Sequence, residues 1–370
     1  MNLKTNELIN LKYMMKVISI ATWLMLLILA GCSDASPYAE EPSAQERTIT
    51  LNLDITTRAD ELLPDNSEPD IIQLWIFDNN ENLITYVVSS QNVWTPVGAE
   101  GKDIKTTLQA EIEAENIDVN QSFKIYLLLN QPYTDDGEGS TAPVDFSDVK
   151  TLDELKGKMF VLTEYKGDNK VPMTGEDTAE FSSVEGNKII FDASINATRC
   201  VAKLGIYCTK SNSASTLVIK QITLGNIPNK GYLFEAPVDN SITYTYTTLS
   251  FTDDIDKFYT DAFPNNFEEF EKIEETSFTQ VYYDYLQENL NGDEDIQIVD
   301  NEIADNKRYY IKLEYTLNGL DDEKIIYLSQ MKRNLLSKIY IRINDAITVD
   351  DIYCQVNSWT EHEIDVPAFE

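Results

Sequence analysis

The chain has 370 residues, of which 29 are lysine or arginine and 63 are aspartate or glutamate, so its formal net charge is −34. Such a polyanion repels phosphate backbones, and no nucleic-acid partner is expected. One histidine in the whole chain argues against histidine-rich metal sites and Ser-His-Asp hydrolysis. A hydrophobic content of 42% is sufficient for packed cores, which excludes global disorder.

The N-terminus has the pattern of an export signal. A basic flank precedes the apolar run 17–30, which would span about 21 Å as a helix, short of the ~30 Å hydrocarbon core. The run ends in Leu-Ala-Gly-Cys at Cys32, the pattern of a bacterial lipobox. We expect residues 1–31 to be a lipoprotein signal peptide and Cys32 to be acylated. An ordinary signal peptide with an incidental cysteine is the alternative.

Residues 32–47 are polar, acidic and rich in proline, serine and alanine. This composition is typical of a flexible tether between a lipid anchor and a folded domain. Beyond it, Ile49, Leu51, Leu53 and Ile55 alternate with polar residues. This period of two predicts a half-buried first strand.

The same period continues along the chain and predicts an all-β protein. A polar turn between two apolar runs predicts a hairpin of residues 71–77 and 83–88. Further strands are predicted at 123–129, 188–193, 199–208, 216–224, 309–317, 324–329, 338–344 and 352–356. This many short strands favour two β-sandwiches, at 48–195 and 196–359, followed by a tail at 360–370.

Short helices are expected as insertions between the strands. Thr151 and Glu154 have the spacing of a capping box, which predicts a helix that begins there. The segments 267–273 and 281–290 have ambiguous patterns, and we interpret both as short helices.

Three cysteines other than Cys32 do not form a disulfide framework, because their number is odd. Cys200 and Cys208 lie on one predicted strand, about 26 Å apart, too far to bond to each other. We expect small buried side chains, and a bridge from Cys354 to one of the two stays open.

Catalytic and metal-binding patterns are weak. Acidic residues around Asn291 and Glu302 have the spacing of a calcium loop, but Ile296 stands where the sharp turn requires glycine. No phosphate-binding loop or nucleophile elbow occurs in the sequence. We therefore expect no metal, no cofactor and no enzymatic activity.

Several landmarks in this order resemble the fimbrillin family, the subunits of type V fimbriae. After the lipobox and the first strand, they are Leu74–Asp78 (LWIFD), Val171–Gly175 (VPMTG), Arg199–Leu204 (RCVAKL), Lys332–Asn334 (KRN) and Val356–Trp359 (VNSW). The resemblance implies two transthyretin-like β-sandwiches exported as a lipoprotein. It also implies a fimbrial subunit that polymerises by donor-strand exchange and serves cell adhesion.

In that family an arginine-specific protease cuts after the first strand, which then leaves its groove to a C-terminal strand of another subunit. Carried onto this chain, the cut falls at Arg58-Ala59, with Arg47 as another possible point. The donor is the tail 360–370, where Ile364, Val366 and Ala368 alternate with polar residues or proline. Other fimbrial subunits, the outer membrane and a surface receptor are the implied partners. The alternative is an uncleaved outer-membrane lipoprotein that acts as a fimbrial anchor or binds glycan or protein.

Overall fold

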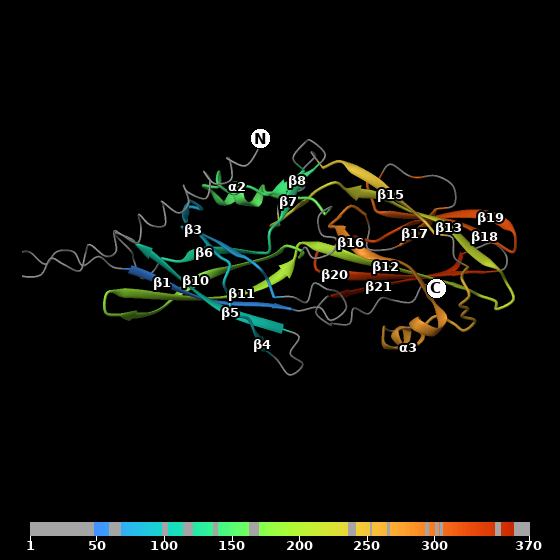
Figure 1. Ribbon diagram of the computed structural model, residues 1–370, viewed down its shortest axis with the longest axis horizontal. Helices are drawn as coiled ribbons and strands as arrows, with labels where there is room; N and C mark the ends of the chain where they lie inside the picture. The colour runs from blue at the N-terminus through green and yellow to red at the C-terminus, as the bar shows by residue number, and fades with distance from the viewer. Residues whose placement is uncertain are drawn as a thin grey trace, which may run out of the picture. The chain divides into compact units, whose positions relative to one another are not determined.

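The computed structural model describes residues 48–58, 68–97, 103–113, 121–135, 140–162, 170–235, 242–251, 254–264, 267–292, 296–299, 303, 306–344 and 349–358. The predicted lipidation site Cys32, the residue Ala59 and the tail 360–370 lie outside this part of the chain. The described part is nearly all β, as predicted (Figure 1). Neither of its helices is long and apolar enough to cross a membrane.

The first part of the chain forms one eight-stranded sheet. Its order is β3-β2-β6-β10-β11-β1-β5-β4. The strands are β1 (Thr48–Arg58), β2 (Ile72–Phe77), β3 (Leu83–Ser89), β4 (Thr95–Val97), β5 (Asp103–Glu113), β6 (Phe123–Leu129), β10 (Met173–Glu185) and β11 (Lys188–Arg199). Small two-stranded pairs accompany it: β7 (Tyr133–Asp135) with β8 (Thr141–Pro143), and β9 (Met159–Phe160) with β14 (Gly231–Tyr232).

The sheet curves so that its two arms enclose one core. Alternate residues of β1, β2, β5, β6, β10 and β11 form a single buried cluster. The rings of Phe123 on β6 and Phe191 on β11 meet edge to face, with centroids 5.0 Å apart. Because the arms share this core, they make the two layers of a sandwich, which we call the first sandwich.

The outer face of β2 and β6 is also buried, because a second apolar cluster covers it. Trp75 and Phe77 pack there with Leu152 and Leu155 of α2 (Leu152–Lys156) and with residues 200–201 and 233–234. The helix begins as predicted: Thr151 Oγ1 accepts a hydrogen bond from the amide of Glu154, whose carboxylate accepts one from the Thr151 amide. The chain therefore closes the outer face with segments from both parts of the fold.

The second part of the chain is a two-layer sandwich, which we call the second sandwich. One sheet has the order β16-β12-β20-β21, and the other β15-β13-β18-β19-β17. Their apolar faces form one core cluster. The strands are β12 (Val201–Lys210), β13 (Leu217–Pro228), β15 (Tyr244–Ser250), β16 (Thr279–Gln287), β17 (Gln297–Val299), β18 (Tyr310–Leu317), β19 (Leu320–Tyr327), β20 (Leu335–Ile343) and β21 (Val349–Ser358).

Most of the predicted elements are present, but one is of the wrong type. The hairpin of β2 and β3 and the helix α3 (Phe267–Ser277) agree with the sequence. The predicted helix at 281–290 is wrong, because these residues belong mainly to β16. There the chain pairs with β12 in antiparallel register. The predicted division at 195–196 falls within β11, shortly before the chain changes sheets at Cys200.

Candidate functional site

The first strand is a central strand of its sheet. β1 pairs in parallel with β11, from Thr48 beside Lys188 to Thr57 beside Ala197. On its other side it pairs antiparallel with β5, from Thr48 to Arg58. Its backbone groups therefore have partners on both sides, and its removal would leave a gap between β11 and β5.

The inward face of β1 is fully buried. Ile49, Leu51, Leu53 and Ile55 are each at most 1% exposed and belong to the core of the first sandwich. The alternation seen in the sequence therefore places these four side chains in the core.

On the outward face of β1, Thr50 is buried, whereas Asn52 and Asp54 make polar contacts near the surface. Asp54 forms an ion pair of 2.6 Å with Lys105 of β5, and the side chain of Asn52 donates to Asp192 of β11 at 3.0 Å. Exposed pairs of this kind contribute little to stability. The strand is thus held by its apolar face and its backbone ladder.

The C-terminal end of β1 carries the predicted cleavage point. Thr57 is buried, and its hydroxyl donates to the carbonyl of Ala197 at 3.3 Å. Arg58 is the last residue of β1 and lies opposite Asp103 of β5. The peptide bond from Arg58 to Ala59 thus lies where the paired strand ends. Cleavage of this bond stays a prediction.

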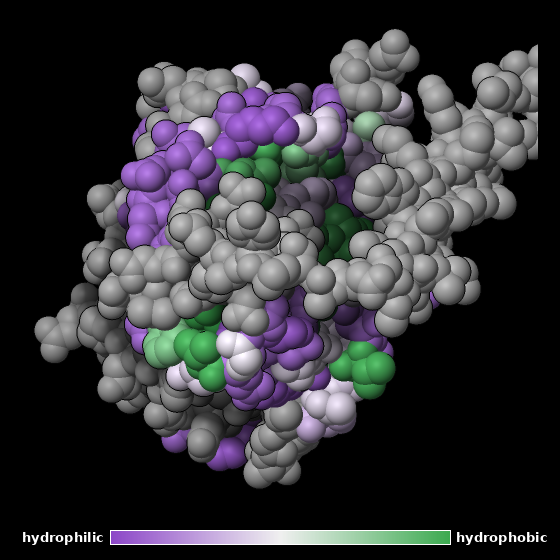
Figure 2. All heavy atoms as spheres, turned by 90° about the vertical axis from the view of Figure 1, so that its left-hand side faces the viewer, coloured by the Kyte–Doolittle hydropathy of each residue, from purple (hydrophilic) through white to green (hydrophobic). Residues whose placement is uncertain are grey.

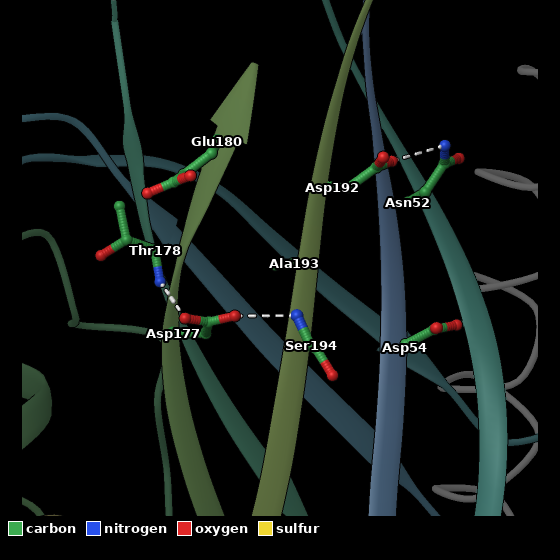
Figure 3. Close-up of a pocket in the computed structure, with 8 residues that line it drawn as sticks. All are labelled: Asn52, Asp54, Asp177, Thr178, Glu180, Asp192, Ala193 and Ser194. Atoms are coloured by element: carbon green, nitrogen blue, oxygen red, sulfur yellow. Dashed lines mark hydrogen bonds between the residues drawn. The ribbon is translucent and has the colours of Figure 1, made fainter. Parts of the chain in front are cut away.

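A recess of about 510 Å³ lies on the outer side of β1, β10 and β11 (Figure 3). Four carboxylates line it, those of Asp54, Asp177, Glu180 and Asp192. Asp177 accepts hydrogen bonds from the amide groups of Ser194, at 2.7 Å, and of Thr178, at 2.8 Å. No group of three or more acidic, histidine or cysteine side chains in the described part of the chain is placed to hold a metal ion. We interpret the recess as a solvated acidic face.

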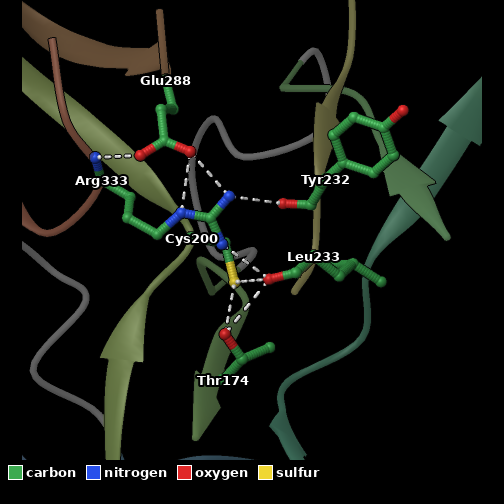
Figure 4. Close-up of polar contacts among 6 residues, drawn as sticks. All are labelled: Thr174, Cys200, Tyr232, Leu233, Glu288 and Arg333. Atoms are coloured by element: carbon green, nitrogen blue, oxygen red, sulfur yellow. Dashed lines mark hydrogen bonds and ion pairs between the residues drawn. The ribbon is translucent and has the colours of Figure 1, made fainter. Parts of the chain in front are cut away.

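A partly buried ion pair lies where the two sandwiches meet (Figure 4). Arg333 binds the carboxylate of Glu288 through Nε at 3.0 Å and Nη2 at 2.8 Å. It also donates to the carbonyl groups of Leu233, at 2.9 Å, and Tyr232, at 3.2 Å. The guanidinium thus joins the strand β14 and the end of β16 to the start of β20. Its planar set of donors suits this geometry.

The same junction contains Cys200 and Thr174. Thr174 Oγ1 donates to the carbonyl of Leu233 at 3.2 Å, and the Cys200 thiol lies 3.4 Å from that oxygen. Burial raises the pKa of the Cys200 thiol to about 11, which makes it unreactive. Three of the landmark segments, 171–175, 199–204 and 332–334, thus meet at one place. The sequence flagged these segments but did not reveal this structural role.

The remaining cysteines agree with the expectation of small buried side chains. Cys200 and Cys208 are free and buried, and burial raises the pKa of Cys208 to about 12. Because both thiols are free, neither forms the bridge to Cys354 that the sequence left open.

No family model matches the chain. No curated protein matches it in sequence. In structure it is similar to a fimbrial assembly protein from Parabacteroides distasonis, with a TM-score of 0.51, 11% identity, and coverage of 86% of this chain and 98% of that one. It is also similar to a protein assigned to cell adhesion from Bacteroides eggerthii, with a TM-score of 0.49, 12% identity and coverage of 84% and 95%.

The tip fimbrial protein Mfa3 from Porphyromonas gingivalis, with C-terminal truncation, gives a TM-score of 0.44 at 12% identity, with coverage of 83% and 98%. Among these three, the TM-score of the fimbrial assembly protein alone exceeds 0.5, and the fold assignment rests on it. The chain therefore has the fold of that fimbrial assembly protein, as the resemblance to the fimbrillin family implies.

Proposed function

We propose that this protein is a structural fimbrial subunit that polymerises by donor-strand exchange and serves cell adhesion. In this proposal it is exported as a lipoprotein through Cys32, and a protease cuts at Arg58-Ala59. β1 then leaves, and the tail 360–370 of another subunit takes its place. The observation that carries the proposal is the position of β1, central in the sheet with one face wholly buried.

Loss of β1 would leave an apolar groove that needs a new occupant. Each fully buried aliphatic side chain contributes about 1.5–3 kcal/mol, so the four inward residues together contribute roughly 6–12 kcal/mol. The strands β5 and β11 would also each present an unpaired edge. An extended segment from another chain satisfies both needs, by the addition of a strand.

The tail has the spacing of apolar residues that fits such a groove. Ile364, Val366 and Ala368 lie two residues apart, as do the inward residues of β1. In an extended segment these three side chains lie on one face, and Glu363, Asp365 and Pro367 lie on the other. A head-to-tail contact that does not close produces a filament.

The cellular setting is part of the same proposal. The lipid on Cys32 would hold the precursor at the outer membrane, and the mature subunit would lie in a fimbrium at the cell surface. Its partners would be other fimbrial subunits and a surface receptor.

The decisive experiment treats purified precursor with an arginine-specific protease. We expect loss of the residues up to Arg58 and the appearance of SDS-resistant ladders. Arg58→Ala should keep β1 in its groove and the protein monomeric, whereas the matched control Arg47→Ala should still polymerise. Polymerisation of Arg58→Ala at the normal level would remove Arg58 from the mechanism.

A chain that lacks 360–370 distinguishes the role of strand donor from the role of strand acceptor. It should fold and accept a tail but should not donate one, so normal polymerisation of this variant would refute the tail assignment. Cleavage of the complete chain without oligomers would instead favour the uncleaved anchor or binding protein.

A further inference from the structure

The register of β1 indicates from which end a donor strand enters the groove. β1 begins beside Lys188, at the turn of the β10–β11 hairpin, and its last pair with β11 joins Thr57 to Ala197. A donor that takes the place of β1 in the same direction enters at the hairpin turn. A donor in the opposite direction enters at the Ala197 end.

The Ala197 end is already occupied by the chain's own second sandwich. Cys200 directly follows β11, and Val201 begins β12. Cys200 and Val201 pack in one buried cluster with Trp75 of β2 and Phe234. A second subunit at this end would compete for space with that cluster. The hairpin end, in contrast, is the end away from the second sandwich (Figure 1).

The donor subunit must lie close to the mouth of the groove. Ser358, the last residue of β21, precedes Ile364 by six positions (364 − 358). At 3.3–3.6 Å per residue this segment spans about 22 Å at most. If Ile364 is the first inward side chain of the donor strand, the donor's second sandwich contacts the hairpin end of the acceptor.

The hairpin carries two exposed apolar side chains beside this mouth. Phe181 is 44% exposed and Val184 is 55% exposed, although both are on a strand. Phe181 lies opposite Phe191, and Val184 opposite Ile189. Opposite residues of an antiparallel pair share one face, so both side chains extend the apolar face of β11 outward.

The edge of β10 at this place has no strand partner among the described residues. β6 pairs with β10 only as far as Ala179, and the next residues pair with β11 alone. A bulge between Phe181 and Ser183 bends the strand there. The face seen in Figure 2 shows apolar residues set among polar ones at this end of the fold.

We propose that Phe181 and Val184 form a docking surface for the second sandwich of the donor subunit, a second copy of this chain. The inference rests on the proposed strand exchange. It adds the direction in which the donor strand enters the groove and a contact between subunits outside the groove. The full chain carries a formal net charge of −34, so strongly acidic copies repel each other. An apolar contact beside the groove offsets part of this repulsion.

The test uses one acceptor and two donors. The acceptor is the chain without 360–370, processed by an arginine-specific protease, and the donors are a peptide of residues 360–370 and the uncleavable Arg58→Ala chain. We expect Phe181→Ser with Val184→Ser in the acceptor to weaken capture of the whole donor about tenfold, or about 1.4 kcal/mol. Capture of the peptide should not change, which also shows that the acceptor is folded.

The matched control replaces two exposed apolar residues of the second sandwich, Tyr246→Ser with Leu320→Ser, and should capture both donors normally. Equal capture of the whole donor by the hairpin variant and its parent would overturn the docking surface while strand exchange stands. If the parent captures neither donor, the proposed function fails, and this inference fails with it.

Polarity is tested separately by cross-linking. Ser358→Cys in the donor should cross-link to Glu185→Cys at the hairpin of the acceptor. It should not cross-link to Lys105→Cys, which pairs with Thr56 near the other end of the groove. The reverse pattern would place the donor at the Ala197 end and overturn the proposal.

Discussion

Substitution of Leu53 by alanine tests how firmly the core holds the first strand. Leu53 is fully buried and lies between Ala193 of β11 and Leu108 of β5. Truncation of a buried leucine in such a site costs about 2–5 kcal/mol, from lost transfer energy and the remaining cavity. We expect Leu53→Ala to lower the free energy of unfolding by this amount, measured by urea titration with tryptophan fluorescence.

The same substitution should make the strand easier to displace. If the lost stability weakens only the binding of β1 to the rest of the sandwich, a cost of 2 kcal/mol raises the population of molecules with an open groove about 30-fold. Uncleaved Leu53→Ala should then capture a labelled peptide of residues 360–370, which the parent chain captures poorly. Leu320→Ala, at an exposed position of β19, should change stability by less than about 0.5 kcal/mol. A cost at Leu53 no larger than at Leu320 would refute the assignment of β1 to the core.

Other predictions concern the junction, the thiols and the response to acid. Arg333→Met should lower the free energy of unfolding by about 1–3 kcal/mol in urea titrations, because the partly buried Glu288 carboxylate loses its charged partner and the carbonyl groups of Tyr232 and Leu233 lose their donor. With all other cysteines replaced by serine, Cys200 and Cys208 should resist a thiol reagent at pH 8 and react only after unfolding; fast labelling of the native protein would contradict their burial. Burial raises the pKa of Asp322, but hydrogen bonds from a tyrosine hydroxyl, the backbone and a lysine together lower it by more. The pKa therefore ends below its ordinary value. A lowered pKa stabilises the fold above the unfolded pKa, so the difference in Tm between the parent and Asp322→Asn should shrink as the pH falls below about 4.

Strand pattern was readable from the sequence, whereas strand partners were not. The alternation at 49–55 correctly predicts a strand with one buried face. Nothing in these residues states that the neighbours are β5 and the distant β11, because register depends on which apolar faces meet in the folded chain. The strand β5 was missed, although Ile104, Leu108, Ala110 and Ile112 carry the same alternation.

Elements with local signals were predicted better than elements that depend on their neighbours. The helix at Leu152 has its own cap at Thr151, and the structure confirms it. The segment 281–290 has tyrosines that fit either period, and its pairing with β12 makes it a strand. The contacts of Arg333 could not be derived either, since its partners come from two distant segments, at 232–233 and at Glu288.

The parallel pairing of β1 and β11 also bears on how the chain folds. Asn52 and its partner Asp192 are 140 residues apart in sequence, and contacts across such separations form slowly because a long loop must close first. During synthesis β1 is made before both of its neighbours and must wait for them. The sheet is complete only when β1 has paired with the distant β11, and a foreign strand that meets β11 before then can compete for the same edge.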